Sequence, residues 1–169
     1  MAAGIFTVYQ DLALCDELSV TANLFLGREQ TGPGRLPLLD EVHMEAAARA
    51  VLQDLGVHLP DLRARVSSLS GGQRQCVAVA RAVLGAPSLV ILDEPTAALA
   101  VSQVALVLEL VRRLRARGLG VLLISHNLQD VFAVADRVVV MRLGRVTAGF
   151  PTAGTSPTSV VAAITGAAA

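Results

Sequence analysis

Two kinds of hydrophobic pattern follow one another along this chain. Short, almost wholly apolar runs are typical of buried strands, and longer segments with apolar residues at every third or fourth position are typical of helices. The apolar runs predict strands at Ile5–Tyr9, Ser88–Leu92 and Leu119–Ile124. From Ser88 onward strands and helices alternate, which indicates parallel strands joined by helical crossovers.

Helices are predicted where a capping residue precedes a periodic segment. Ser19 is expected to cap a helix ending near Gly27, and Asp40 is expected to cap a helix ending before Gly56. The apolar side predicted for the helix after Asp40 consists of Val42, Ala46, Val51 and Leu55. The helix predicted at 101–117 has an apolar stripe of Val101, Val104, Leu108, Val111 and Arg115.

Three more helices and a hairpin complete the expected elements. Helices are predicted at 71–84, 128–135 and from Ser156-Pro157 to Gly166. A hairpin of Arg137–Met141 and Val146–Gly149 is expected to turn at Gly144.

Composition narrows the class of protein. The chain has 169 residues, of which 53% are hydrophobic, and a mean hydropathy of +0.59. This much apolar surface excludes a disordered chain. The apolar runs are nevertheless shorter than the ~18 residues that a membrane-crossing helix needs. The pattern therefore predicts an α/β domain whose sheet is buried on both faces.

Charge and cysteine content exclude several kinds of chemistry. Fourteen basic residues balance fourteen acidic ones, so the chain lacks the basic surface expected of a nucleic-acid or anionic-lipid binder. Every basic residue in that count is Arg, which excludes a lysine-dependent phosphate loop, Schiff base or general base within this chain. Cys15 and Cys76 are too few for a disulfide framework and indicate reduced thiols in the core of a cytosolic protein. No signal peptide is expected, because no basic segment followed by an apolar core opens the sequence.

The first candidate motif is Leu69-Ser70-Gly71-Gly72-Gln73, at the predicted start of a helix. Ser70 and Gln73 fit a capping box, in which each side chain accepts from the other residue's amide. Gly71 and Gly72 are poor helix formers, so a second interpretation gives them a function. Without side chains they leave a row of amide groups open at the positive end of the helix, where a phosphate can bind.

The second motif is the adjacent pair Asp93-Glu94, which ends the strand Leu89–Leu92. Open α/β sheets bind ligands at this carboxyl edge. Neighbouring strand residues point to opposite faces, so one carboxylate can face a hydrated Mg²⁺ while the other polarises an attacking water. The alternative is an ordinary helix N-terminus, where Asp and Glu are common.

The third motif, Ser125-His126-Asn127, directly follows the strand Gly120–Ile124. A single histidine at such a position, like His126, is more often a capping or surface residue, with Asn127 as the cap of the next helix. Its place in the chain favours function, because it leaves the sheet at the same edge as Asp93 and Glu94. We therefore expect the three side chains to converge on one ligand.

Together and in this order, the motifs resemble the ATP-binding cassette (ABC) ATPase family, a P-loop NTPase-like α/β fold with a mainly parallel sheet. The resemblance implies ATP and Mg²⁺ as cofactors. It implies that Ser70–Gln73 is the signature that binds the γ-phosphate of ATP held by the opposite subunit. It also implies that Asp93 serves Mg²⁺, that Glu94 is the general base and that His126 is the switch histidine.

Gln10, in Val8-Tyr9-Gln10, is similar to the family's Q-loop glutamine, which senses Mg²⁺ and couples to a transmembrane partner. The stretches 8–14, 23–29 and 124–131 further resemble ATPases of bacterial simple-sugar importers of the ribose, xylose and fructose group. This resemblance implies a head-to-tail dimer of ATPase domains on the cytoplasmic face of the inner membrane. Its partners would be a permease and, indirectly, a periplasmic sugar-binding protein, with no role for nucleic acid.

Two family features are not found in these residues. The phosphate loop G-x-x-x-x-G-K-[ST] should precede Gln10 by a long stretch, and the chain contains no lysine. We therefore expect a single, incomplete ABC ATPase domain, inactive by itself and without the strand and helix of the phosphate loop. Its expected parts are 1–68 (Q-loop strand and helical part), 69–150 (signature, carboxylate pair and switch) and 151–169 (last helix and tail). Where the family usually has S-A-L-D, this chain has Ala97-Ala98-Leu99-Ala100, so a cross-subunit hydrogen bond from an acidic residue there is in doubt.

Two other functions stay open at this stage. The chain is alternatively a non-catalytic module that lends its signature helix in trans to a partner's ATP, or an inactive relic. Chromosome-structuring and DNA-repair ATPases share the signature, but they carry long coiled coils, and this chain has no sustained heptads.

Overall fold

The computed structural model describes residues 4–33 and 38–167 of the chain. The chain divides into two compact units, residues 1–124 and residues 125–169, and each is described by itself. The predicted division into 1–68, 69–150 and 151–169 follows functional segments rather than compact units and stays a prediction. Residues 168–169 of the tail lie outside the described part.

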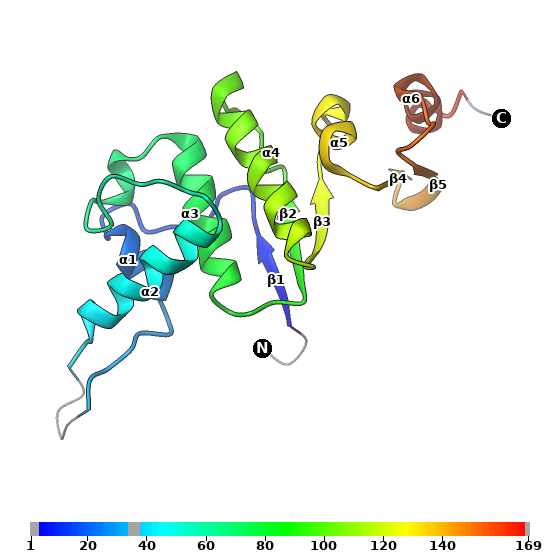
Figure 1. Ribbon diagram of the computed structural model, residues 1–169. Helices are drawn as coiled ribbons and strands as arrows, with labels where there is room; N and C mark the ends of the chain where they lie inside the picture. Colours follow the sequence, from blue (N-terminus) through cyan, green and yellow to red (C-terminus); the bar gives the residue numbers. More distant parts are fainter. Residues whose placement is uncertain (1–3, 34–37, 168–169) are drawn as a thin grey trace. The chain divides into compact units, whose positions relative to one another are not determined.

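The first unit contains a parallel sheet in the order β1 (Ile5–Val8), β2 (Leu89–Asp93) and β3 (Gly120–Ile124) (Figure 1). Val8 pairs with Leu92 and Asp93 pairs with Ile124, so all three strands end at the same edge. This confirms the parallel sheet with helical crossovers. The first strand ends at Val8, before the predicted Tyr9, so Gln10 lies in a turn rather than at a strand end.

In the described part of this unit, residues 4–33 and 38–124, four α-helices and a short 3₁₀ helix accompany the sheet. Ser19 and Asp40 cap α1 and α2 as predicted, since their side chains accept from the amides of Ala22 and His43. The helix α3 is central, because it packs against α1, α2, α4 and β1. The bounds are α1 (Val20–Phe25), α2 (Glu41–Asp54), η1 (Val66–Ser68), α3 (Gly71–Val83) and α4 (Val101–Ala116).

The buried face of α2 differs from the prediction. Val42 is 77% exposed and Ala46 is also exposed, whereas Leu55, just past the helix, is buried as expected. The side chains that do become buried are Met44, Ala48 and Leu52. These residues are spaced by four and so form a single stripe along the helix, and it is this stripe that faces the rest of the unit.

The buried face of α4 is also shifted toward its C-terminal half. Val101 is 89% exposed, and Leu108 and Val111 are buried as predicted. The remaining buried positions are Val107, Leu110 and Leu114. Val101 is the first residue of α4 and directly follows an exposed loop residue, so the position in the unit decides its exposure, not the periodicity of the helix.

The predicted burial of the sheet on both faces is wrong, because in β2 only one face is fully buried, and Leu89, Ile91 and Asp93 on the other face are partly exposed. Val90 and Leu92 are completely buried, whereas Leu122 is 50% and Ile124 47% exposed. The difference is between the two faces of the sheet. Leu122 pairs with Ile91 and Ile124 pairs with Asp93, whereas the side chains of Val90 and Leu92 point to the opposite face. The prediction that Leu119–Ile124 is a buried strand was therefore wrong.

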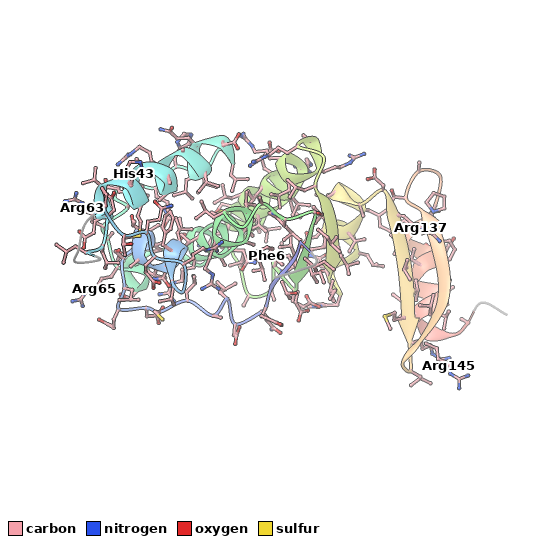
Figure 2. All side chains as sticks on the ribbon, turned by 90° about the horizontal axis from the view of Figure 1, so that it is seen from below. Phe6, His43, Arg63, Arg65, Arg137 and Arg145 are labelled. Atoms are coloured by element: carbon pink, nitrogen blue, oxygen red, sulfur yellow. The ribbon has the colours of Figure 1, made fainter. Side chains whose placement is uncertain are left out.

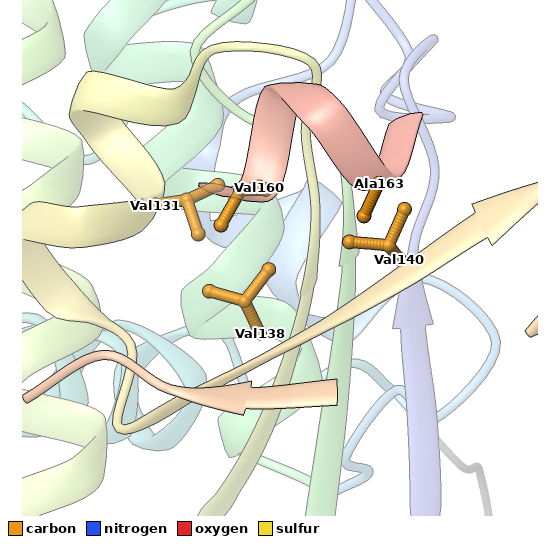
Figure 3. Packing of buried hydrophobic residues seen from close by; sticks show 5 residues of the cluster. All are labelled: Val131, Val138, Val140, Val160 and Ala163. Carbon is orange, nitrogen blue, oxygen red and sulfur yellow. The ribbon is translucent and has the colours of Figure 1, made fainter. Parts of the chain in front are cut away.

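The second unit is a hairpin packed on a helix. It contains α5 (Leu128–Val134), the antiparallel strands β4 (Arg137–Arg142) and β5 (Arg145–Pro151), and α6 (Pro157–Thr165). The hairpin turns at Gly144 and Gly166 caps the end of α6, as predicted. Both glycines have a positive φ. Its core is a cluster of small apolar side chains (Figure 3), namely Val131, Val138, Val140, Val160 and Ala163. Within the described residues of both units, no helix combines the length and hydropathy needed to span a bilayer.

Candidate functional site

The first turn of α3 contains the predicted capping box. The Ser70 Oγ accepts from the Gln73 amide at 3.3 Å, and the Gln73 Oε1 accepts from the Ser70 amide at 3.0 Å. Within the described residues, the backbone amides of Gly71 and Gly72 donate no hydrogen bond. The two interpretations of this motif are therefore compatible, because the capping box orders the turn and leaves the glycine amides available to an anion.

Close packing of α3 on α4 gives a second reason for glycine at position 72. A Cβ on Gly72 would lie 2.9 Å from the Gln103 Cβ and 3.4 Å from the Gln103 Cα. A Cβ on Gly71 would meet only flexible ends, the Leu99 Cδ2 at 2.9 Å and the Gln103 Oε1 at 3.5 Å. Sequence reasoning missed Leu99 and Gln103, because nothing in the local sequence indicates that α3 and α4 begin side by side.

Asp93 and Glu94 lie at the carboxyl end of β2. Asp93 pairs with Ile124, and the Glu94 amide donates to the Ile124 carbonyl at 2.9 Å, which extends the pairing of β2 with β3 by one residue. Glu94 has a φ of 47°, in the left-handed region that non-glycine residues rarely adopt. Such backbone strain clusters at functional sites. Both carboxylate residues are partly buried, and the Oε2 of Glu94 is fully buried.

Gln10 leaves the same edge of this sheet. It is exposed and follows Val8, the partner of Leu92, by two positions. The segment after it is tightly turned, since the Leu12 amide donates to the Tyr9 carbonyl at 2.9 Å. The structure therefore brings Gln10, Asp93 and Glu94 to one edge of the sheet.

His126 belongs to the second unit. It is exposed and precedes Asn127, whose Oδ1 accepts from the amides of Gln129 at 3.0 Å and Asp130 at 3.5 Å. The Asn127 amide in turn donates to the Ser125 Oγ at 3.0 Å. The cap at Asn127 is confirmed, whereas the convergence of His126 with the carboxylates stays a prediction.

The donors and acceptors suit a magnesium-bound phosphate ester. Gly71 and Gly72 offer amides at the positive end of a thirteen-residue helix, which favours an anion. Asp93 offers one carboxylate, and Mg²⁺ usually takes only one or two from a protein. Among the described residues, no group of three or more His, Cys, Asp or Glu side chains forms a metal cage.

Comparison with known proteins identifies close relatives over most of the chain. The family model described as "ABC transporter" matches residues 1–97. The fructose import ATP-binding protein of Rhizobium meliloti is 52% identical over 148 residues, covering 85% of this chain and 57% of the relative. The xylose/arabinose import ATP-binding protein of Sulfolobus acidocaldarius is 46% identical over 143 residues, covering 85% of this chain and 56% of the relative. The chain thus spans a little over half the length of these relatives.

Solved structures share the fold. The ADP conformation of an ATP-binding cassette of an ABC transporter superposes with a TM-score of 0.71 at 26% identity, covering 96% of this chain and 65% of that one. A dimeric post-hydrolysis state of another ATP-binding cassette, bound to ADP and Pi, gives a TM-score of 0.70 at 22% identity, covering 90% and 65%. The expected fold class and the resemblance to sugar-import ATPases are confirmed.

Proposed function

This chain belongs to the ABC transporter family, and we propose that it is part of the ATP-binding and ATP-hydrolysing subunit of an importer for a simple sugar. The observation that carries the proposal is the arrangement at one edge of the parallel sheet, where Asp93 is the last residue of β2 and Glu94 and Gln10 come after β2 and β1. The names of the relatives, import ATP-binding proteins for fructose and for xylose or arabinose, support the sugar class.

Each side chain has a distinct role in this proposal. Asp93 holds Mg²⁺, which neutralises charge on the phosphate oxygens when it is bound. Glu94 orients the attacking water and accepts its proton, as a general base does. His126 contacts the γ-phosphate, and Gln10 senses the metal and the transmembrane partner.

The signature turn acts on a nucleotide held by a second ATPase domain in a head-to-tail dimer. The amides of Gly71 and Gly72 and the side chains of Ser70 and Gln73 face the γ-phosphate of that ATP. The 169 residues contain no lysine, so the lysine of the phosphate loop is supplied from outside them. Closure of the dimer drives a membrane permease at the cytoplasmic face, and a periplasmic sugar-binding protein delivers the sugar.

The test uses a chimera in which the segment of the R. meliloti fructose protein that precedes the matched region is joined to this chain. Glu94→Gln should keep ATP binding and lower turnover by roughly a hundredfold or more, the usual contribution of a general base. The matched control is Glu109→Gln, which removes an exposed carboxylate of α4 paired with Arg112 and Arg113 and should leave turnover intact. Normal hydrolysis in Glu94→Gln would remove Glu94 from the role of base.

A second candidate, a module that lends its signature in trans, is favoured by the two glycine amides left available in the first turn of α3. Titration with a fluorescent ATP analogue and Mg²⁺ distinguishes the candidates. Binding that requires an added intact homologue supports the lending of the signature, and binding in neither condition supports the inactive relic.

A further inference from the structure

Hydrogen bonds join the last turn of α3 to the segment that follows Gln10. The guanidinium of Arg81 donates from Nη1 to the Ala13 carbonyl at 2.6 Å and from Nη2 to the Leu12 carbonyl at 2.8 Å. These partners lie 68 and 69 positions away in the sequence. A planar fork that bonds two successive carbonyls is particular to arginine, since the ammonium of a lysine is a single point on a flexible stem.

The two carbonyls belong to strained residues. Leu12 has a φ of 61° and Ala13 a φ of 46°, both in the left-handed region that disfavours side chains with a Cβ. Residues persist there only when their surroundings hold them. Within the segment, the Leu12 amide donates to the Tyr9 carbonyl. From outside the segment, Arg81 holds the carbonyls of Leu12 and Ala13 with its two hydrogen bonds.

The end of α3 that carries Arg81 is itself fixed. Arg28 donates from Nη2 to the Arg81 carbonyl. Just past the helix, a Cβ on Gly85 would lie 2.1 Å from the Cζ of Phe6, so the Phe6 ring of β1, labelled in Figure 2, lies directly over this glycine. Arg81 is partly buried, and burial lowers its pKa, but arginine remains charged at any physiological pH. The hydrogen bond from Arg81 to the Leu12 carbonyl is partly buried, whereas the bond to the Ala13 carbonyl is exposed to solvent.

We propose that Arg81 is a positioning residue that makes residues 10–14 move together with α3, the helix that begins with the signature Ser70–Gln73. A helix of this length moves as one rod, so a displacement of Ser70–Gln73 at its start reaches Arg81 at its end. The carbonyls of Leu12 and Ala13 then follow, because staying behind would break both bonds. The roles of the two ends rest on the proposed function, but the link between them needs no nucleotide.

Hydrogen–deuterium exchange on the 169-residue chain tests the link. Arg81→Met removes both donors, and the Leu12 amide, which donates to the Tyr9 carbonyl, should exchange about three- to tenfold faster, as expected for the loss of net hydrogen bonds. The amides in the middle of α3 should keep their protection. Arg81→Lys retains the charge and should be intermediate. The control variant Arg49→Met removes an arginine that contacts Glu45 on α2, and its amides should exchange at the same rates as those of the unaltered chain.

Tyrosine fluorescence gives a second readout. Tyr9 is the chain's single tyrosine, there is no tryptophan, and Tyr9 borders the segment. Its quenching by acrylamide should change in Arg81→Met and not in Arg49→Met. Unchanged exchange of the Leu12 amide in Arg81→Met would overturn the proposal. So would equal acceleration throughout α3 in both Arg81 variants, because Arg81 would then stabilise the helix as a whole. Neither outcome bears on Glu94, so the two proposals fail separately.

Discussion

Gly72 and Gln103 are in direct contact where α3 and α4 begin, and a methyl group on Gly72 would lie 2.9 Å from the Gln103 Cβ. The neighbouring atoms are the Cβ, Cγ and Cα of Gln103, which cannot move aside without shifting α4. The signature therefore has a packing role within its own chain besides any role toward a ligand.

Gly72→Ala should lower the free energy of unfolding by about 1 to 2 kcal/mol, because the overlap outweighs the better helix propensity of alanine. Urea denaturation of the 169-residue chain measures the change. Gly71→Ala is the matched control and should be nearly neutral, since its new methyl group meets the movable tip of Leu99. Equal stability of the two variants would contradict the packing role of Gly72.

Asn23 should tolerate no replacement by aspartate. It is completely buried, its Oδ1 accepts from the Cys15 amide at 2.8 Å, and its Nδ2 donates to the carbonyls of Cys15, Leu18 and Ser19. Asn23→Asp points an oxygen at those carbonyls and buries a charge, so we expect a loss of about 3 kcal/mol or more in unfolding free energy.

The matched control for this change is Asn127→Asp. Asn127 is exposed and caps α5 only as an acceptor, so aspartate can make the same bonds. The free energy of unfolding of the Asn127→Asp variant should differ from that of the unaltered chain by only a few tenths of a kcal/mol. A similar, small effect at both positions would show that the four bonds of Asn23 contribute little.

The two thiols should differ sharply in reactivity. Burial raises the pKa of Cys76 to about 12, whereas Cys15 is exposed. Because the thiolate is the reactive form, a thiol reagent at pH 8 should modify only Cys15 in the folded chain. Absorbance with Ellman's reagent should give one thiol in native buffer and two in denaturant. Two thiols at the same rate in native buffer would contradict the burial of Cys76.

The carboxylate of Glu45 should report on its two arginines. A hydrogen bond from the Arg63 Nε at 2.8 Å lowers the pKa of Glu45, with a smaller effect from Arg49 (Arg63 is labelled in Figure 2). Because the pKa is lowered by folding, the stabilisation is present above the ordinary pKa of glutamate and is lost as the pH falls through the folded-state value. Arg63→Gln should raise the pKa of Glu45 in an NMR titration more than Arg49→Gln does. Equal shifts would contradict the dominant role of Arg63.

Local signals in the sequence were sufficient for most elements and for the motif positions. The caps at Ser19, Asp40, Ser70, Asn127 and Ser156 depend on hydrogen bonds within one turn of chain, and all are confirmed. The Asp93-Glu94 pair follows an apolar run and therefore had to lie at a strand end. Such features are decided over a few residues, and the sequence alone determined them.

Tertiary structure decided which faces are buried and which distant residues meet. Periodicity alone did not distinguish the stripe of Met44, Ala48 and Leu52 from that of Val42 and Ala46, because both are apolar at helical spacing. The contacts of Gly72 with Gln103 and of Arg81 with Leu12 and Ala13 join segments far apart in the chain. They arise only when α3 packs at once on α4 and beside β1, and no local preference of either partner encodes that packing.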